Sequence, residues 1–315
     1  MKKRRIKKSI IKKGIITLAG LIAILIIHSV FKTGEYHKTN EYKLKKIGYN
    51  SEEINIIKKT SETNINYILE KDYNKNICEI IKEKYYIDKN FKEYIEYIEK
   101  TNETPKETIS IINTNADKKE YTDTKSTNIE KKDIMLVNKY NYLEKNYEPD
   151  KIIDIPSRYA YSGKKAPEEI LNKYIEMFNA AEKQEMKFVI SSAYISYEEQ
   201  EEIYEYYKTI KKENIEKYIS LPGYSEDQTG LTFDILTLST TQENFEKTDE
   251  FKWLNENAYK YGFILRYPKG KEKITKYDYQ PWHYRYVGKD AAKIIHDEDI
   301  TLEEFYAFYI ANKQQ

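Results

Sequence analysis

Asp227, Asp234 and His283 are the residues of this sequence whose types and spacing point most directly to chemistry. The two aspartates lie in the stretch P-G-Y-S-E-D-Q-T-G-L-T-F-D-I-L at 222–236, and the histidine ends Y-Q-P-W-H at 279–283. Carboxylates and imidazoles both bind divalent metals, Zn²⁺ included. The ligands of such a site converge from separate strands and loops, so a long gap in the sequence is no objection. We therefore expect a loop and two strands to bring these three side chains into one cleft.

At these residues the chain resembles the zinc D-alanyl-D-alanine carboxypeptidases of the VanY type, which trim peptidoglycan. In that family the loop reads S-x-H-x-x-G-x-x-x-D and the later strand reads E-P-W-H. The two histidines and the aspartate bind zinc, and the glutamate is the general base. The resemblance implies that Asp234 and His283 are metal ligands. Asp227 stands where the first histidine is expected, and Gln280 stands where the glutamate is expected.

A third difference from the family motif lies in a segment that the resemblance places against the substrate. Residues 192–196 read S-A-Y-I-S, where the family has S-G-Y-R-S with an arginine that holds the peptide substrate. An arginine binds a carboxylate through two parallel hydrogen bonds, and Ile195 makes none. The resemblance also places Ser225 and Gln200 near the substrate. Arg285 remains as a cation on a neighbouring strand, so we expect it in the substrate site.

Two longer stretches extend the resemblance. They read W-L-N-E-N-A-Y-K-Y-G-F-I-L-R-Y-P at 253–268 and P-W-H-Y-R-Y-V-G at 281–288. Arg266, in the first of them, is expected to be structural. The resemblance covers the chain from about residue 134 to residue 310.

The substitutions at 227 and 280 weaken the chemistry that the resemblance implies. A zinc ion with three protein ligands keeps one position for water, lowers the pKa of that water towards about 7 and polarises the scissile carbonyl. Asp227 adds a second carboxylate, which predicts weaker zinc binding or its loss, weaker Lewis acidity, or a preference for Mn²⁺ or Mg²⁺. Gln280 orients water but takes no proton, and general acid–base catalysis is worth about 10²–10⁴-fold. Glu226 or Asp278 acts as a replacement base in one interpretation, and both are ordinary polar residues in the other.

Three functional hypotheses follow. In the first, the chain is a catalytically impaired member of this family, a pseudoenzyme of the cell wall that binds peptidoglycan stem peptides. In the second, it is an active zinc D,D- or L,D-carboxypeptidase with an unusual metal shell. In the third, it is a non-catalytic interaction scaffold of the cell envelope. Metal content separates the first two from the third, and release of D-alanine separates the second from the first.

The composition excludes some other classes. Lys and Arg number 53 and Asp and Glu 52, so the net charge of +1 carries no signature of nucleic-acid binding. A single cysteine, Cys78, excludes an intramolecular disulfide and a multi-cysteine metal site.

The N-terminal region predicts the compartment. Residues 1–13 form a basic tail, which we expect in the cytoplasm, and residues 14–31 are uncharged and mostly apolar. A helix of that length spans roughly 27 Å, close to the hydrocarbon thickness of a bilayer. Positive charge before the span predicts a single-pass membrane protein whose C-terminal domain is extracytoplasmic. A cleaved signal peptide is the alternative, but no A-x-A-like site follows the apolar segment.

The remaining chain predicts an α+β protein, with a small, mostly antiparallel sheet flanked by helices. We expect a stalk at 32–50, a helical spacer at 51–133 containing one strand at 108–112, and the VanY-like domain at 134–315. Strands are predicted at 187–192, 263–267 and 282–287. Helices are predicted to start at Pro167, to span 197–212 and 251–261 with a stop at Gly262, and to start at a Thr301–Glu304 capping box.

Overall fold

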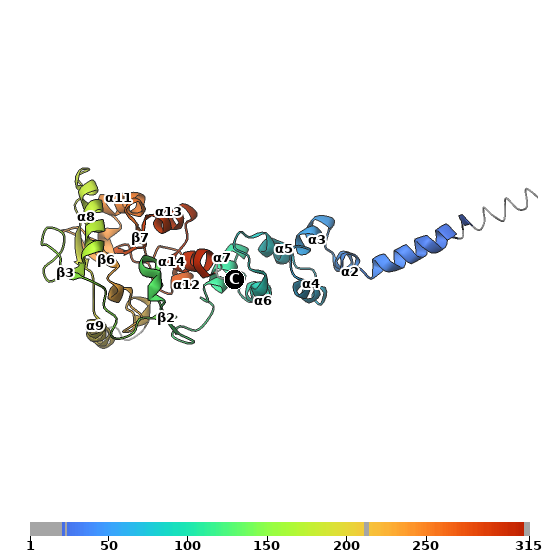
Figure 1. Cartoon of the computed structure of the whole chain (residues 1–315), viewed down its shortest axis with the longest axis horizontal. Helices are drawn as coiled ribbons and strands as arrows, with labels where there is room; N and C mark the ends of the chain where they lie inside the picture. Colours follow the sequence, from blue (N-terminus) through green and yellow to red (C-terminus); the bar gives the residue numbers. More distant parts are fainter. Residues whose placement is uncertain (1–20, 23, 211–213, 312–315) are drawn as a thin grey trace, which may run out of the picture. The chain divides into compact units, whose positions relative to one another are not determined.

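The computed structural model describes residues 21–22, 24–210 and 214–311. The chain divides into two compact units, residues 1–109 and 110–315 (Figure 1). The basic tail predicted at 1–13 lies outside the described residues, as do residues 14–20 and 23 of the predicted anchor. Within the described residues, none of the helices combines the length and the apolar character needed to cross a membrane.

The first unit is helical. Residues 24–37, part of which was predicted as a stalk, form a helix. The later helices are α2 (Asn40–Ile47), α3 (Ser51–Ile57), α4 (Glu62–Leu69), α5 (Lys75–Lys82), η1 (Asp88–Asn90) and α6 (Phe91–Thr101). Polar N-caps start several of them, and Asn50 with Glu53 forms a full capping box at α3. Isoleucines on one face of each helix make up most of the core of this unit.

The strand predicted at 108–112 is wrong. These residues belong to helix α7 (Pro105–Asn113). Thr104 and Glu107 exchange hydrogen bonds across the first turn, and Pro105 occupies the first helical position. This arrangement is a capping box with proline at N1, which outweighs the β propensity of the T-I-S-I-I run.

A four-stranded antiparallel sheet forms the centre of the second unit. Its order is β5 (Val189–Ser192), β6 (Thr232–Leu236), β8 (His283–Tyr286) and β7 (Phe263–Leu265). Side chains alternate between the two faces of each strand. Phe233 and Ile235 are fully buried in the core, so Thr232 and Asp234 lie on the opposite face. This face carries the candidate site.

Helices cover the core face of the sheet. These are α8 (Glu168–Glu182), α11 (Asp249–Asn257) and α13 (Lys289–Glu298) (Figure 1). Tyr174 of α8 packs edge-on against Phe233, with ring centroids 5.3 Å apart. As predicted, α8 starts after Pro167 and Gly262 ends the helical segment before β7.

Smaller elements complete the second unit. They are β1 (Lys125–Ser126), η2 (Ile129–Ile134), β2 (Asn141–Tyr142), β3 (Ile152–Asp154), β4 (Lys165–Pro167), α9 (Tyr197–Ile210), η3 (Ile215–Lys217), η4 (Glu226–Thr229), α10 (Gln242–Phe245), η5 (Ala258–Tyr261), α12 (Glu272–Thr275), α14 (Leu302–Phe305) and the π-helical segment η6 (Tyr306–Ala311). The predicted Thr301–Glu304 capping box is present at α14. The predicted α+β fold is confirmed.

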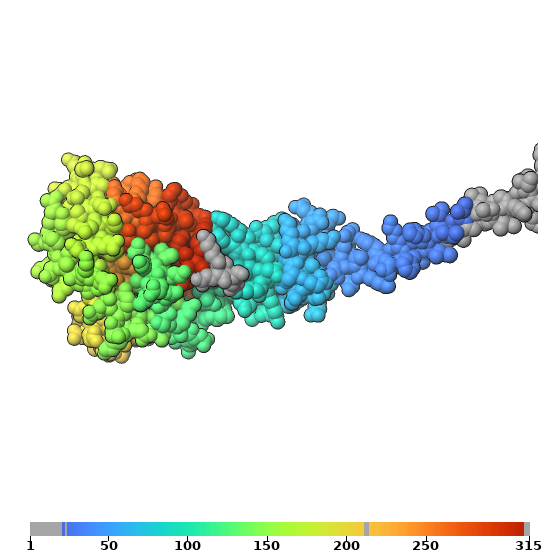
Figure 2. Space-filling model, in the orientation of Figure 1, coloured from blue at the N-terminus to red at the C-terminus, as the bar shows by residue number. Residues whose placement is uncertain are grey.

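The segment before β3 is an integral part of the second unit. Figure 2 shows it in green against the red C-terminal helices. Asn138 donates to Glu303, and Ser110 donates to Glu304, both at buried positions. These contacts tie the start of the second unit to its end.

Candidate functional site

Asp234 and His283 are brought together by the pairing of β6 and β8. They are direct partners in the antiparallel register, and His283 Nδ1 lies 2.7 Å from Asp234 Oδ1. The imidazole is buried and stacks on Tyr267, with ring centroids 5.1 Å apart. The other ring nitrogen, Nε2, is buried without a hydrogen-bond partner among the described residues.

Asp227 reaches the same face from the loop before β6. It lies in the short helix η4, where Ser225 Oγ accepts from the backbone N–H of Asp227, and the helix ends at Gly230. Thr232 Oγ1 donates a 2.5 Å hydrogen bond to Asp227 Oδ1. Gly230 has φ +70°, and a Cβ there would lie 2.6 Å from Pro167 Cγ, so this turn requires glycine. The turn therefore fixes where Asp227 meets the strand.

Burial and charge shape the protonation of this group. Burial raises the pKa of Asp227 to about 6, and Asp234 adds to the rise while His283 opposes it. Burial alone lowers the pKa of His283, but the hydrogen bond and charge of Asp234 outweigh it and raise that pKa above its ordinary value. The carboxylate of Asp234 thus stabilises the protonated form of the imidazole that it contacts.

The arrangement can be tested against the zinc that the resemblance implies. The side chains of Asp234 and His283 are hydrogen-bonded to each other, and Asp227 accepts from Thr232. Across the described parts of the chain, no group of three or more His, Cys, Asp or Glu side chains is arranged to hold a metal ion. Carboxylates and imidazoles are both zinc ligands, so the donor types fit the ion, but their hydrogen bonds to each other and to Thr232 do not present them to it together. Metal binding by these three residues stays a prediction.

Gln280 lies in the turn that precedes β8, not on a strand. Its backbone carbonyl accepts from the N–H of His283 at 3.2 Å, and its side-chain amide donates to the carbonyl of Tyr218 at 3.4 Å. Asp278 precedes it in the same irregular segment, so the expectation that Asp278 shares a strand face with Gln280 is wrong. No carboxylate stands at the Gln280 position.

A buried ion network supports the loop from behind. Glu226 Oε1 accepts from Arg285 at 2.8 Å and Glu226 Oε2 accepts from Arg266 at 2.8 Å. Arg266 also forms two hydrogen bonds with Glu303. Burial alone would raise the pKa of Glu226, but the two guanidinium groups hold it below its ordinary value. The structural role predicted for Arg266 is confirmed.

This network corrects two expectations. Arg285 is completely buried, and its remaining donors bind the carbonyls of Asp133, Met135 and Tyr286. A buried guanidinium whose three nitrogens all donate to groups inside the protein is not the substrate cation that the sequence suggested. Glu226 is buried and paired as well, so it is not a replacement base.

Ile195 lines a cleft beside the site. The cleft has a volume of about 1000 Å³ and lies between the β3–β4 hairpin, the 192–196 loop and the start of α9. The backbone N–H of Ile195 donates to the carbonyl of Asp227 at 3.3 Å, and Ser192 pairs with Asp234 in the sheet. We call this space the Ile195 cleft.

Gln200 and Ser225 lie near this region but take structural roles. The amide of Gln200 is buried and donates to the carbonyl of Ser220 at 2.8 Å. Ser225 caps η4. Neither residue lines the Ile195 cleft. Their predicted contact with substrate stays a prediction.

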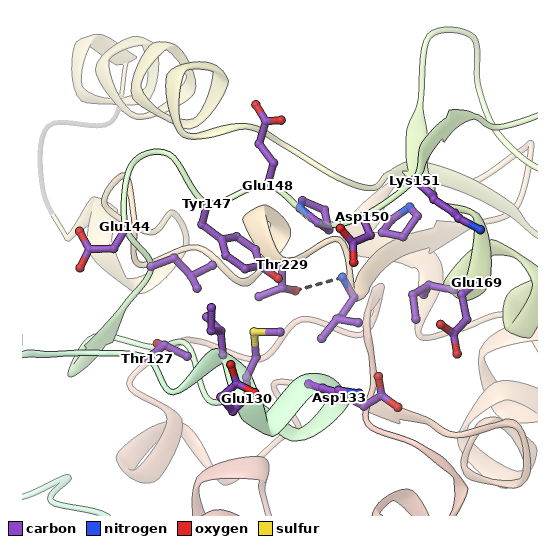
Figure 3. A pocket seen from close by; sticks show the side chains of 18 of the residues that line it. Thr127, Glu130, Asp133, Glu144, Tyr147, Glu148, Asp150, Lys151, Glu169 and Thr229 are labelled. Atoms are coloured by element: carbon purple, nitrogen blue, oxygen red, sulfur yellow. Dashed lines mark hydrogen bonds between the residues drawn. The ribbon is translucent and has the colours of Figure 1, made fainter.

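A second cavity, of about 820 Å³, was not predicted from the sequence. In Figure 3, Tyr147 and Thr229 lie near its middle, with the carboxylates of Glu130, Asp133 and Glu169 around them. Burial raises the pKa of Asp133, and Glu169 adds to the rise. The lining comes from segments far apart in the chain, so no local motif could have indicated it.

Comparisons with known proteins agree with this geometry. Residues 163–289 match the family model described as "VanY: D-alanyl-D-alanine carboxypeptidase". The chain is 43% identical over 186 residues to the protein YodJ of Bacillus subtilis (strain 168), covering 55% of this chain and 66% of that one. It is 39% identical over 138 residues to a D-alanyl-D-alanine carboxypeptidase of Enterococcus faecium, covering 44% and 42%. The chain thus spans less than two thirds of either curated relative.

A solved structure extends the likeness to three dimensions. The LdcB LD-carboxypeptidase, described as revealing the molecular basis of peptidoglycan recognition, is 39% identical to this chain. The match covers 60% of this chain and 92% of LdcB, with a TM-score of 0.55.

Proposed function

Because the chain belongs to the VanY-type D-alanyl-D-alanine carboxypeptidase family, we propose that it binds peptidoglycan stem peptides and hydrolyses them slowly or not at all. The observation that carries this proposal is the pairing of Asp234 with His283 next to Gln280, an amide that takes no proton. The site keeps the shape of a peptidase cleft and lacks its base.

Two further observations support impaired catalysis. Asp227 brings a second carboxylate to the centre and is engaged by Thr232. Glu226, one of the two candidates for a replacement base, is buried and paired with two arginines, which leaves only Asp278 of the pair for that role. Loss of a general base alone costs about 10²–10⁴-fold in rate.

The working enzyme remains the rival. Metal content and turnover distinguish an impaired protein from an active enzyme. Both are measured on the full-length chain, purified in detergent without a histidine tag. We expect far less than one zinc per chain by elemental analysis. We also expect release of D-alanine from a stem pentapeptide at least about 10²-fold below that of the Enterococcus faecium relative. Stoichiometric zinc with release at the relative's rate would establish the active enzyme instead.

We also propose that the N-terminal region anchors the protein and that the second unit works outside the cytoplasm. The support is the run of exposed apolar side chains in the described part of the predicted anchor: Leu21, Ile22, Ile24, Leu25, Ile26, Ile27, Val30 and Phe31. Such a run is unusual on a water-facing helix. Membrane fractionation with alkaline washing tests the anchor, and protease accessibility in intact cells tests the side. Release of the whole protein by the wash would exclude an integral anchor.

A further inference from the structure

The charge of the Ile195 cleft bears on which end of a peptide it accepts. Four carboxylates line it against two ammonium groups, which leaves two negative charges in excess: Glu148, Asp154, Glu199, Glu202, Lys164 and Lys165. Asp154 and Lys165 are partners in the register of β3 and β4, so they largely balance each other. The excess negative charge therefore lies on Glu148 and on the α9 residues Glu199 and Glu202.

The wall next to the site centre carries no cation. Its residues are Ser192, Ala193, Tyr194, Ile195 and Ser196, and its backbone contacts that of Asp227 and Asp234. Burial raises the pKa of the Tyr194 phenol, and the nearby Glu148 and Glu199 raise it further. The same Glu148 and Glu199 belong to the lining, so the negative charge of the cleft is assigned from its lining residues.

Glu199 is held in place on this wall. Its carboxylate accepts from the backbone N–H of Ser196 at 2.8 Å, and Ser196 Oγ accepts from the N–H of Glu199. This capping box starts α9 and points the first turn, with Glu199 and Glu202, along the cleft. A peptide carboxylate entering here would meet like charges on exposed side chains, which weaken its binding.

We propose that the Ile195 cleft receives a peptide whose C-terminal end is uncharged, as an amide or a continuing chain, and discriminates against a free carboxylate. This inference rests on the proposed function, because it takes the ligand to be a stem peptide. The inference adds the chemical nature of the group at the C-terminal end of that peptide. Ile195 is the specificity-determining residue, because it supplies apolar contact where a bound carboxylate would need a cation.

A calorimetric titration of the full-length chain in detergent with chelator present tests the proposal. The probes are two synthetic pentapeptides, L-Ala-γ-D-Glu-L-Lys-D-Ala-D-Ala, one as the free acid and one as the C-terminal amide. We expect the amide to bind about ten-fold more tightly. Equal or tighter binding of the acid overturns the inference while leaving the proposed function intact. Binding of neither peptide overturns the proposed function, and the inference with it.

Substitutions in the cleft test which residues set the preference for the amide. Ile195→Arg should reverse the preference in favour of the acid, and Ile195→Leu should keep it. Glu202→Gln should reduce the preference about two-fold, whereas Glu201→Gln, on the same helix but outside the cleft lining, should leave it unchanged. Glu202 is exposed, so this variant tests the field even if arginine at 195 prevents folding. An unchanged preference in both Ile195→Arg and Glu202→Gln would contradict the assignment.

Discussion

Asp234 and His283 face each other across two antiparallel strands, and the 2.7 Å hydrogen bond between them occupies one nitrogen of the imidazole. A metal would have to separate this pair or bind beyond it. Asp227, where the family motif has a neutral histidine, adds a carboxyl group to the same centre.

Reverting the three positions that differ from the family motif should restore metal binding and peptide hydrolysis. Asp227→His, Gln280→Glu and Ile195→Arg together supply a neutral ligand, a base and a cation for the substrate. We expect stoichiometric zinc and D-alanine release raised by about 10²–10⁴-fold over the unmodified chain. Elemental analysis and a D-alanine assay measure both. Adding Asp234→Ala to the triple variant is the control and should abolish metal binding. A folded triple variant without zinc would show that the site is misplaced.

The pH dependence of stability should report on Asp227. Its pKa of about 6 in the folded protein lies above the ordinary value of 3.8. The folded state therefore binds this proton more tightly, and the stabilisation is complete below pH 3.8 and lost as pH rises through 6. Asp227→Asn keeps an acceptor for Thr232 but cannot ionise. Relative to that variant, the wild type should lose on the order of 2 kcal/mol between pH 4 and pH 7.

Urea unfolding in the presence of chelator, at a series of pH values, measures this difference. The exposed Asp290→Asn serves as matched control and should track the wild type. A constant difference between wild type and Asp227→Asn across the range would contradict the burial of Asp227.

Removing one partner of the buried network should be costly. Glu226→Gln removes the carboxylate that pairs with the buried Arg285, and it leaves Arg266 with the second of its two carboxylate partners, Glu303. We expect the free energy of unfolding of the second unit to fall by about 3–5 kcal/mol. Denaturant titration followed by tryptophan fluorescence measures it. The exposed Glu201→Gln should stay within about 0.5 kcal/mol of wild type. A loss below about 1 kcal/mol for Glu226→Gln would show that the network is dispensable.

Cys78 should be inert in the folded protein. Burial raises the pKa of its thiol to about 11, and the charge of Glu53 adds to the rise. Since the thiolate is the reactive form, alkylation by iodoacetamide at pH 8 should be slower than in urea by about 10²-fold or more. Mass spectrometry of the modified protein follows both rates. Equal rates in the two conditions would mean that α5 opens readily.

Local patterns were sufficient for the elements that carry the site. Alternation around Phe233 and Asp234 indicated a strand with one apolar face, and Gly230 indicated the turn before it. These features depend on neighbours in sequence, so they can be inferred without a structure. The T-P-K-E pattern at 104–107 also contained the signal for α7, but the β-branched run after it was given more weight.

Long-range contacts explain what sequence reasoning missed. Arg266 was expected to be structural, but Arg285 was expected in the substrate site until its partners were known. The partners of the two arginines, Asp133, Met135 and Glu303, come from segments that no spacing rule connects to the strands. The Ile195 cleft is likewise assembled from the hairpin, a loop and α9. The net charge of the cleft lining therefore depends on which distant segments the fold brings together.

The neighbours Glu226 and Asp227 divide two duties between adjacent positions of one short loop. Glu226 is clamped by two arginines inside the protein, and Asp227 is turned towards the open face of the sheet. The residue that holds the loop in place is therefore different from the residue on the candidate site face. A substitution at position 227 should thus leave the backbone of this loop where it is.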